Sequence, residues 1–129
     1  MANRYGRQFT KSGDTERWIL DGYASVTDSV GTPSAITGFG LSSLTRTGVG
    51  SYSVLLQDSW PQFLSGYITL NMPAGLASID PVLVTTDVTV AKTITFKILN
   101  TSGSAVDVPA QTGFWFNFEV KNSGVPRGQ

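Results

Sequence analysis

The chain has 129 residues, which suits a single domain with one core, and 40% of them are apolar. Charged residues make up only 14%, against a usual share of about 25%, and nine basic residues cancel nine acidic ones, so the net positive field of a nucleic-acid-binding protein is absent. The chain has no cysteine and no histidine, which excludes disulfides and thiolate chemistry and removes the commonest general base and metal ligand.

Residues 1–15 are polar, contain two glycines and show no sustained hydrophobic period. We predict an extended arm here, which is disordered alone or ordered by a partner. Arg4, Arg7 and Lys11 concentrate positive charge in this arm. Two interpretations remain open: a solvated terminus, or a docking arm that contacts an acidic surface of another protein, with nucleic acid as a less favoured partner.

Alternation of apolar and polar side chains recurs along the rest of the chain, and no segment shows the 3.6-residue period of a helix. The turns between these segments are rich in glycine and proline. In chain order, we predict strands over residues 17–26, 39–47, 51–57, 66–72, 82–90, 93–99, 105–108 and 114–120. The first strand is expected to be kinked or bulged at Gly22. Short connections after the second and the fifth strand predict two antiparallel hairpins.

The segment 114–120 has the strongest core signal, because three phenylalanines and Val120 share one face of it. We predict that it is a central strand of the fold. Trp115 lies on the opposite face and allows two interpretations: packing against a second layer, or filling a subunit interface. We favour the interface, because the low charge of the chain suggests that part of its surface is covered. The tryptophans and tyrosines together allow a third interpretation, a platform that stacks on sugars.

Seven to eight short strands predict an all-β fold, an antiparallel β-sandwich of jelly-roll or immunoglobulin-like order, formed by residues 16–123. The order of the strands is not determined by the sequence. Residues 124–129 are expected to form a flexible tail.

Recognisable catalytic motifs are missing from the sequence. Its serines have no histidine or cysteine partner, and no phosphate-binding GxxxxGK[ST] loop occurs. Turn-forming hydrogen bonds are the expected role of the loop aspartates Asp28, Asp58, Asp80 and Asp107. We therefore predict that the chain is not an enzyme and holds no metal and no cofactor. No stretch approaches the roughly 20 apolar residues of a membrane helix, so we expect no membrane partner.

An ordered series of short motifs runs along residues 36–123. Its members are Gly38-Phe39, Thr45-Arg46-Thr47-Gly48, Gly50, Tyr52, Val54, Leu56, Asp58, Trp60-Pro61, Val90-Ala91-Lys92-Thr93-Ile94-Thr95, Phe118, Val120, Lys121, Asn122 and Ser123. In this order and spacing they resemble a pattern found in small structural virion proteins of tailed bacteriophages, of the decoration or cement kind. The arm over residues 1–15 lies outside the resemblance. Phe114-Trp115-Phe116 is bulkier than the aliphatic run expected there, which singles out the outer face of this strand.

The resemblance implies a non-enzymatic capsid decoration or cement protein that bridges and stabilises neighbouring capsid subunits. The implied partners are the major capsid protein or other virion proteins, and further copies of the chain in a dimer or trimer. The implied location is the virion, after synthesis in the host cytoplasm. Arg4, Arg7, Lys11 and Trp115 are the residues that we expect to contact partners. The alternative is a tail, neck or head-fibre module that binds host surface glycan or another virion protein.

Overall fold

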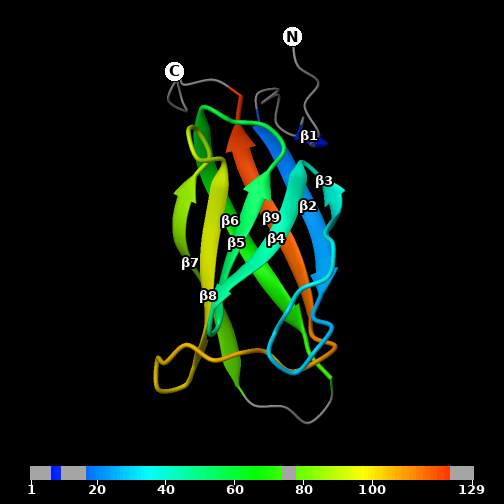
Figure 1. Cartoon of the computed structure of the whole chain (residues 1–129). Coiled ribbons are helices and arrows are strands. Elements are labelled where there is room, and N and C mark those ends of the chain that lie inside the picture. Colours follow the sequence, from blue (N-terminus) through cyan, green and yellow to red (C-terminus); the bar gives the residue numbers. More distant parts are fainter. Residues whose placement is uncertain (1–6, 10–16, 74–77, 123–129) are drawn as a thin grey trace.

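The structure is a computed structural model that describes residues 7–9, 17–73 and 78–122 (Figure 1). Within these ranges the chain forms strands and no helix, which confirms the predicted all-β fold. The strands are β1 (Arg7–Phe9), β2 (Arg17–Ser25), β3 (Thr37–Phe39), β4 (Leu41–Gly48), β5 (Ser51–Leu56), β6 (Gln62–Asn71), β7 (Ile79–Asp87), β8 (Thr93–Asn100) and β9 (Gly113–Lys121). Strands β1 and β3 have only three residues each, and the others have six or more.

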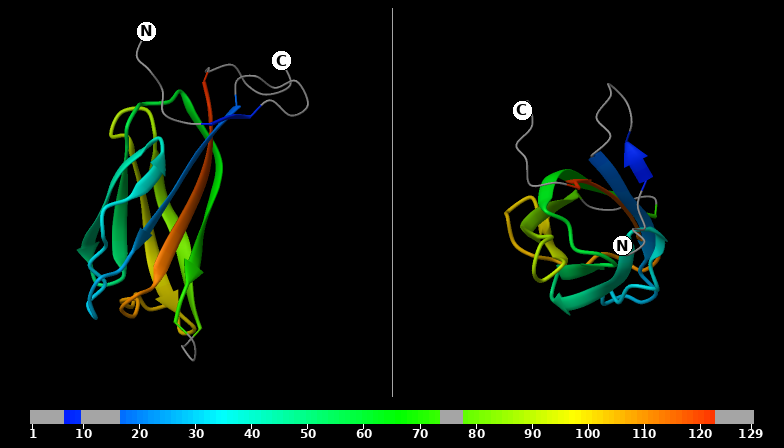
Figure 2. Two further views of the ribbon diagram at one scale, coloured as in Figure 1. Left: turned by 90° about the vertical axis from the view of Figure 1, so that its right-hand side faces the viewer. Right: turned by 90° about the horizontal axis from the view of Figure 1, so that it is seen from above.

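The strands form two antiparallel sheets that face each other as a β-sandwich (Figures 1 and 2). The first sheet has the order β2-β9-β6, and the short strands β1 and β3 both pair with the other edge of β2. The second sheet has the order β4-β5-β8-β7. This order, which the sequence left open, places β2 and β9 side by side although they lie at opposite ends of the chain. Strand β9 is therefore central in its sheet, as predicted.

The six largest fully buried side chains of the core between the sheets are aromatic. Strand β9 contributes Phe114, Phe116, Phe118 and Val120, each at most 1% exposed. From the opposite sheet, the ring of Phe96 lies 5.7 Å from the rings of both Phe114 and Phe116 in edge-on contacts, a favourable geometry for aromatic pairs. Because one face of β9 is fully buried, its alternate side chains must point away from the core.

Both predicted hairpins are present. The β4–β5 hairpin closes through Gly50, whose φ of 60° favours glycine and whose position leaves no room for a side chain, since a Cβ atom would lie 2.5 Å from the carbonyl oxygen of Val106. In the β7–β8 connection, Asp87 Oδ1 accepts hydrogen bonds from the backbone N–H groups of Thr89 and Val90. Strand β7 therefore ends at Asp87, three residues before the end that the sequence predicted.

The bulge that the sequence allowed at Gly22 does not form. The β2–β9 pairing runs without a register shift from Arg17 to Ser25. Glycine is required for a different reason: a Cβ atom at Gly22 would lie 2.8 Å from both Leu41 Cδ1 and the Thr37 carbonyl oxygen. The missing side chain thus lets the chain that carries β3 approach β2 closely.

The single strand predicted over residues 39–47 is divided at Gly40, whose φ is 86°. This one residue carries the chain from β3 in the first sheet to β4 in the second. The strand predicted over residues 105–108 is reduced to one β-bridge between Ala105 and Leu99. Of the predicted arm, residues 7–9 form β1, which pairs with the beginning of β2, and the predicted tail lies outside the described residues.

Candidate functional site

The outer side of the β2-β9-β6 sheet carries a row of side chains set by the pairing of its strands. Because Phe114 and Phe116 are buried, Trp115 points outward and is 53% exposed. The register places Tyr23 of β2 and Thr69 of β6 on either side of Trp115. Residues that pair directly on antiparallel strands share one face of the sheet, so the three side chains lie next to one another. Thr37 of β3, paired with Tyr23, extends the row across the sheet.

A second row lies two residues further along the strands. Phe39 of β3 pairs with Asp21, Asp21 pairs with Asn117, and Asn117 pairs with Tyr67 of β6. The exposed fraction is 45% for Phe39 and 63% for Tyr67. We call the two rows together the aromatic face, made of Thr37, Tyr23, Trp115, Thr69, Phe39, Asp21, Asn117 and Tyr67.

Trp115 is held in place by its neighbour Tyr23. Their ring centroids are 4.9 Å apart and their planes are tilted by 52°. Tryptophan and tyrosine offer a large apolar area on few rotatable bonds, so covering them with a partner costs little conformational entropy. The aromatic face is therefore suited to binding, and its rings stand on strands rather than on loops.

The charge on the aromatic face is low. Asp21 is the only ionisable carboxylate or cationic residue in its two rows. Beyond the second row, the Arg17 guanidinium pairs with the Glu119 carboxylate, and both side chains are at most 20% exposed. A surface rich in aromatic side chains and poor in charge matches the composition of protein interfaces.

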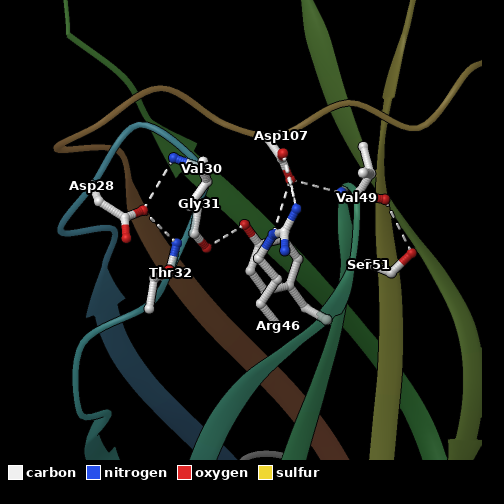
Figure 3. A network of polar contacts seen from close by, with 10 residues as sticks. Asp28, Val30, Gly31, Thr32, Arg46, Val49, Ser51 and Asp107 are labelled. Carbon is white, nitrogen blue, oxygen red and sulfur yellow. Dashed lines mark hydrogen bonds and ion pairs between the residues drawn. The ribbon is translucent and has the colours of Figure 1, made fainter.

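A separate polar network fixes the loops at one end of the sandwich (Figure 3). Asp107 Oδ1 accepts hydrogen bonds from Arg46 Nε at 3.1 Å, from Arg46 Nη2 at 2.9 Å and from the Gly50 backbone N–H at 3.0 Å. Asp107 Oδ2 accepts a further bond from Arg46 Nη2 at 3.0 Å. The carboxylate thereby ties the connection between β8 and β9 to the β4–β5 hairpin.

Tyr52 extends the tie to the connection between β2 and β3. Its buried hydroxyl donates a hydrogen bond to the Gly31 carbonyl oxygen at 2.8 Å (Figure 3). Burial, and then the nearby Asp107 carboxylate, raise the pKa of Tyr52 to about 12. The phenol therefore keeps its proton at neutral pH and serves as a hydrogen-bond donor rather than as a base.

The expected role of loop aspartates is confirmed for Asp28 and wrong for Asp107. Asp28 Oδ1 accepts the backbone N–H groups of Val30 and Thr32, and the Thr32 N–H above all lowers the pKa of this carboxyl. Asp107 makes its bonds to Arg46 and Gly50, which are distant in sequence. A turn signal from neighbouring residues could not reveal those partners.

Of the residues predicted to contact partners, Trp115 lies outward as the alternation predicted. Arg7 belongs to β1, where its backbone pairs with Ile19. Arg4 and Lys11 lie outside the described residues. The structure therefore describes Trp115 in full and, of the three arm cations, only the backbone position of Arg7.

The sequence offered Tyr23 and Tyr67 as platform residues together with all tryptophans and tyrosines, but it did not separate them from buried Tyr52 and Trp60, and it left out Phe39. The alternation within β6 does carry a signal, because buried Ile68 sends Tyr67 to the outside. The register that joins β3, β2, β9 and β6 was still needed to place the four rings on one face of the sheet. By contrast Trp60 is 1% exposed and packs on Trp18, with 5.7 Å between ring centroids, which makes it part of the core.

Other features of the described residues are modest. A shallow depression between the beginning of β7 and the end of β8 is lined by Ser78, Ile79, Asp80, Leu99, Asn100 and Thr101. In the described ranges, acidic side chains do not gather into a group of three or more that could bind a metal ion. None of the residues described there forms a helix that could cross a membrane. Comparisons with known proteins found no matching family model, no matching curated protein and no matching solved structure.

Proposed function

We propose that the chain is a non-enzymatic structural protein of a tailed-phage particle, a capsid decoration or cement that bridges neighbouring capsid subunits. The observation that carries the proposal is the aromatic face, on which Trp115 and Tyr67 are 53% and 63% exposed. Clustered exposed aromatic side chains mark interaction surfaces. The motif series over residues 36–123 supports the virion as the place of that interaction.

The proposed mechanism needs no chemical step. A protein that binds the assembled shell, and not its separate subunits, raises the free energy needed to open the shell by mass action. A modest contact repeated over many copies adds up across the lattice. In this proposal the cations of the arm, Arg4, Arg7 and Lys11, contact an acidic capsid surface, and the aromatic face contacts a further protein surface.

The test is made on particles. The chain is expected in many copies per purified particle, and particles lacking it are expected to release their DNA at a lower temperature. Adding back the wild-type protein should restore heat resistance, while Trp115→Ala should restore less. Val90→Ser is the matched control, because Val90 is 85% exposed on the β7–β8 connection, away from the aromatic face. Particles without the chain, or unchanged heat and pressure resistance after its removal, would contradict the proposal.

The second candidate is a tail, neck or head-fibre module that binds host surface glycan. Asp21 and Asn117 favour it, because they pair directly between Phe39 and Tyr67 and offer a carboxylate and an amide beside aromatic rings. Sugars bind through such combinations of ring stacking and hydrogen bonds. A glycan array decides between the two candidates. If the chain binds a glycan and Trp115→Ala abolishes that binding, the glycan-binding module is favoured. If the chain binds no glycan on the array but binds empty capsids, this candidate is eliminated.

A further inference from the structure

The aromatic face has a regular arrangement about the line between β2 and β9. Strands β3 and β6 flank this line at equal distance, and so do β2 and β9. In the first row the order across the sheet is Thr37, Tyr23, Trp115 and Thr69. Residues of like chemistry therefore stand at mirrored positions: threonine at both ends and an aromatic ring at both central places.

The second row follows the same rule with the aromatic rings at its ends. Its order across the sheet is Phe39, Asp21, Asn117 and Tyr67. The two central places hold a carboxylate and an amide. An amide can donate hydrogen bonds to a carboxylate, so the centre of this row is complementary to itself when it is reversed.

We infer that the aromatic face is the interface of a dimer of this chain, with a two-fold axis parallel to the strands and midway between β2 and β9. A rotation about this axis lays β2 of one copy over β9 of the other and β3 over β6. Trp115 then meets Tyr23 of the second copy, and Tyr67 meets Phe39. Each contact occurs twice, as a two-fold interface requires.

The charges of the chain allow this pairing. The same rotation places Asp21 opposite Asn117 of the second copy rather than opposite another carboxylate. Arg17 and Glu119, which lie beyond the second row, already neutralise each other within one copy. The formal net charge of zero adds no long-range repulsion between copies.

The size of the outer face limits the strength of the dimer. This face has three strands of at least nine residues, β2, β9 and β6, and the three residues of β3 beside them. At about 4.8 Å per strand and about 3.4 Å per residue, it measures about 500 Å² in projection, so two copies would cover about 1,000 Å², which is typical of weak interfaces. We therefore expect a dissociation constant in the micromolar range, a value suited to a protein that assembles further on a larger particle.

A second copy explains more of the face than the other occupants do. A glycan would bind at Asp21 and Asn117 in the centre of the second row. Glycan binding would not account for the two threonines, Thr37 and Thr69, at opposite ends of the first row. A capsid protein would have to supply a complementary surface of its own, of which this chain gives no sign. The inference rests on the proposed structural role, but its test needs only the purified chain, so its failure would leave the particle experiment standing.

The test uses Thr37 and Thr69, two exposed residues on β3 and β6 that the axis brings together. In Thr37→Lys/Thr69→Glu, each lysine would face a glutamate of the other copy. In Thr37→Lys/Thr69→Lys, it would face a lysine. Two such pairs should tighten the dimer about tenfold in the first variant and weaken it about tenfold in the second.

Two further variants complete the set. Thr45→Lys/Thr47→Lys adds the same charge to exposed positions of β4 in the other sheet and should leave dimerisation unchanged. Trp115→Ala should weaken the dimer at least tenfold, since a tryptophan at the centre of an interface carries much of the binding. Thermal unfolding of each variant confirms that the fold is retained.

Dimerisation is measured by sedimentation velocity as a function of concentration. A wild-type dimer with opposite responses of the two Thr37/Thr69 variants supports the inference. A wild-type chain that stays monomeric up to about 1 mM overturns it, whether or not the chain binds glycan or capsid. Equal dissociation constants for the two charge variants also overturn it, because the proposed axis requires them to differ.

Discussion

Asp107 offers a direct measure of how the loops at one end of the sandwich are held. Replacing it by alanine removes three hydrogen bonds to Arg46 and one to the Gly50 N–H. Hydrogen bonds to charged groups contribute about 1.5–3 kcal/mol each when they are well buried. The Arg46 and Asp107 side chains are 26% and 25% exposed, so solvent screens part of the ion pair. We expect a total loss of about 2–3 kcal/mol in the free energy of unfolding.

Asp107→Asn removes the negative charge that pairs with Arg46 but keeps an oxygen that can accept a hydrogen bond. Its amide oxygen can still accept the Gly50 N–H, so it should lose only about half as much stability as the alanine variant. Arg46→Ala and the double variant Arg46→Ala/Asp107→Ala complete a cycle that removes the packing of the arginine stem from the comparison. The expected coupling free energy is about 1–2 kcal/mol.

Thermal and urea unfolding, followed by circular dichroism, provide the assay. For a domain of this size, a loss of 2–3 kcal/mol lowers Tm by about 6–15 °C. Two results would contradict this expectation: a coupling free energy indistinguishable from zero, or an Asp107→Asn variant as destabilised as Asp107→Ala. Either result would mean that the geometry of the pair adds nothing to the stability of the fold.

Three further predictions concern stability and ionisation. Phe116→Ala should lower the free energy of unfolding by about 3–5 kcal/mol, because the Phe116 ring is fully buried. Trp115→Ala should lower it by only about 1–2 kcal/mol, because the Trp115 ring is half exposed. Urea unfolding measures both losses. The pKa of Tyr52 is raised to about 12, so the stability it contributes is complete below pH 10 and is lost as pH rises toward 12; phenolate absorbance should show one late-titrating tyrosine that Tyr52→Phe removes. Backbone N–H donors lower the pKa of two carboxyls from 3.8: mainly the Thr32 N–H for Asp28, and mainly the Val90 N–H for Asp87. The stability that these carboxylates contribute is therefore present above pH 3.8 and is lost as the pH falls through the lowered pKa values. Asp28→Ala and Asp87→Ala should each have a lower Tm than the wild type at neutral pH, and this difference should disappear in acid.

Most of the longer strands could be predicted because they bury alternate side chains, whereas β3, whose three residues are all exposed, was not distinguished from β4. The two-residue alternation in segments such as 51–57 and 114–120 reflects that burial directly, and nothing else in the chain competes with it. Glycine was harder to interpret. In a strand, a glycine such as Gly22 can mark either a bulge or a place where another segment packs closely against the backbone. Only the positions of Leu41 and Thr37 in the structure show that Gly22 is of the second kind.

Contacts between distant segments could not be predicted. Asp107 looks like an ordinary loop aspartate until Arg46 is placed beside it. Likewise, the alternation in β9 predicts that Trp115 points outward, but it does not reveal that Phe39 and Tyr67 lie on the same face. Those neighbours depend on the strand order, which follows from how two sheets close around a core and not from any one segment.

In the working assembly the aromatic face should be covered by a partner. Hydroxyl-radical footprinting measures this most directly, by comparing the oxidation of Trp115 and Tyr67 in the dilute chain, in the concentrated chain and in purified particles. Both rings should be strongly protected on assembly, while Val90 should stay as reactive as before. Oxidation of Trp115 and Tyr67 at the same rate in all three samples would contradict this expectation.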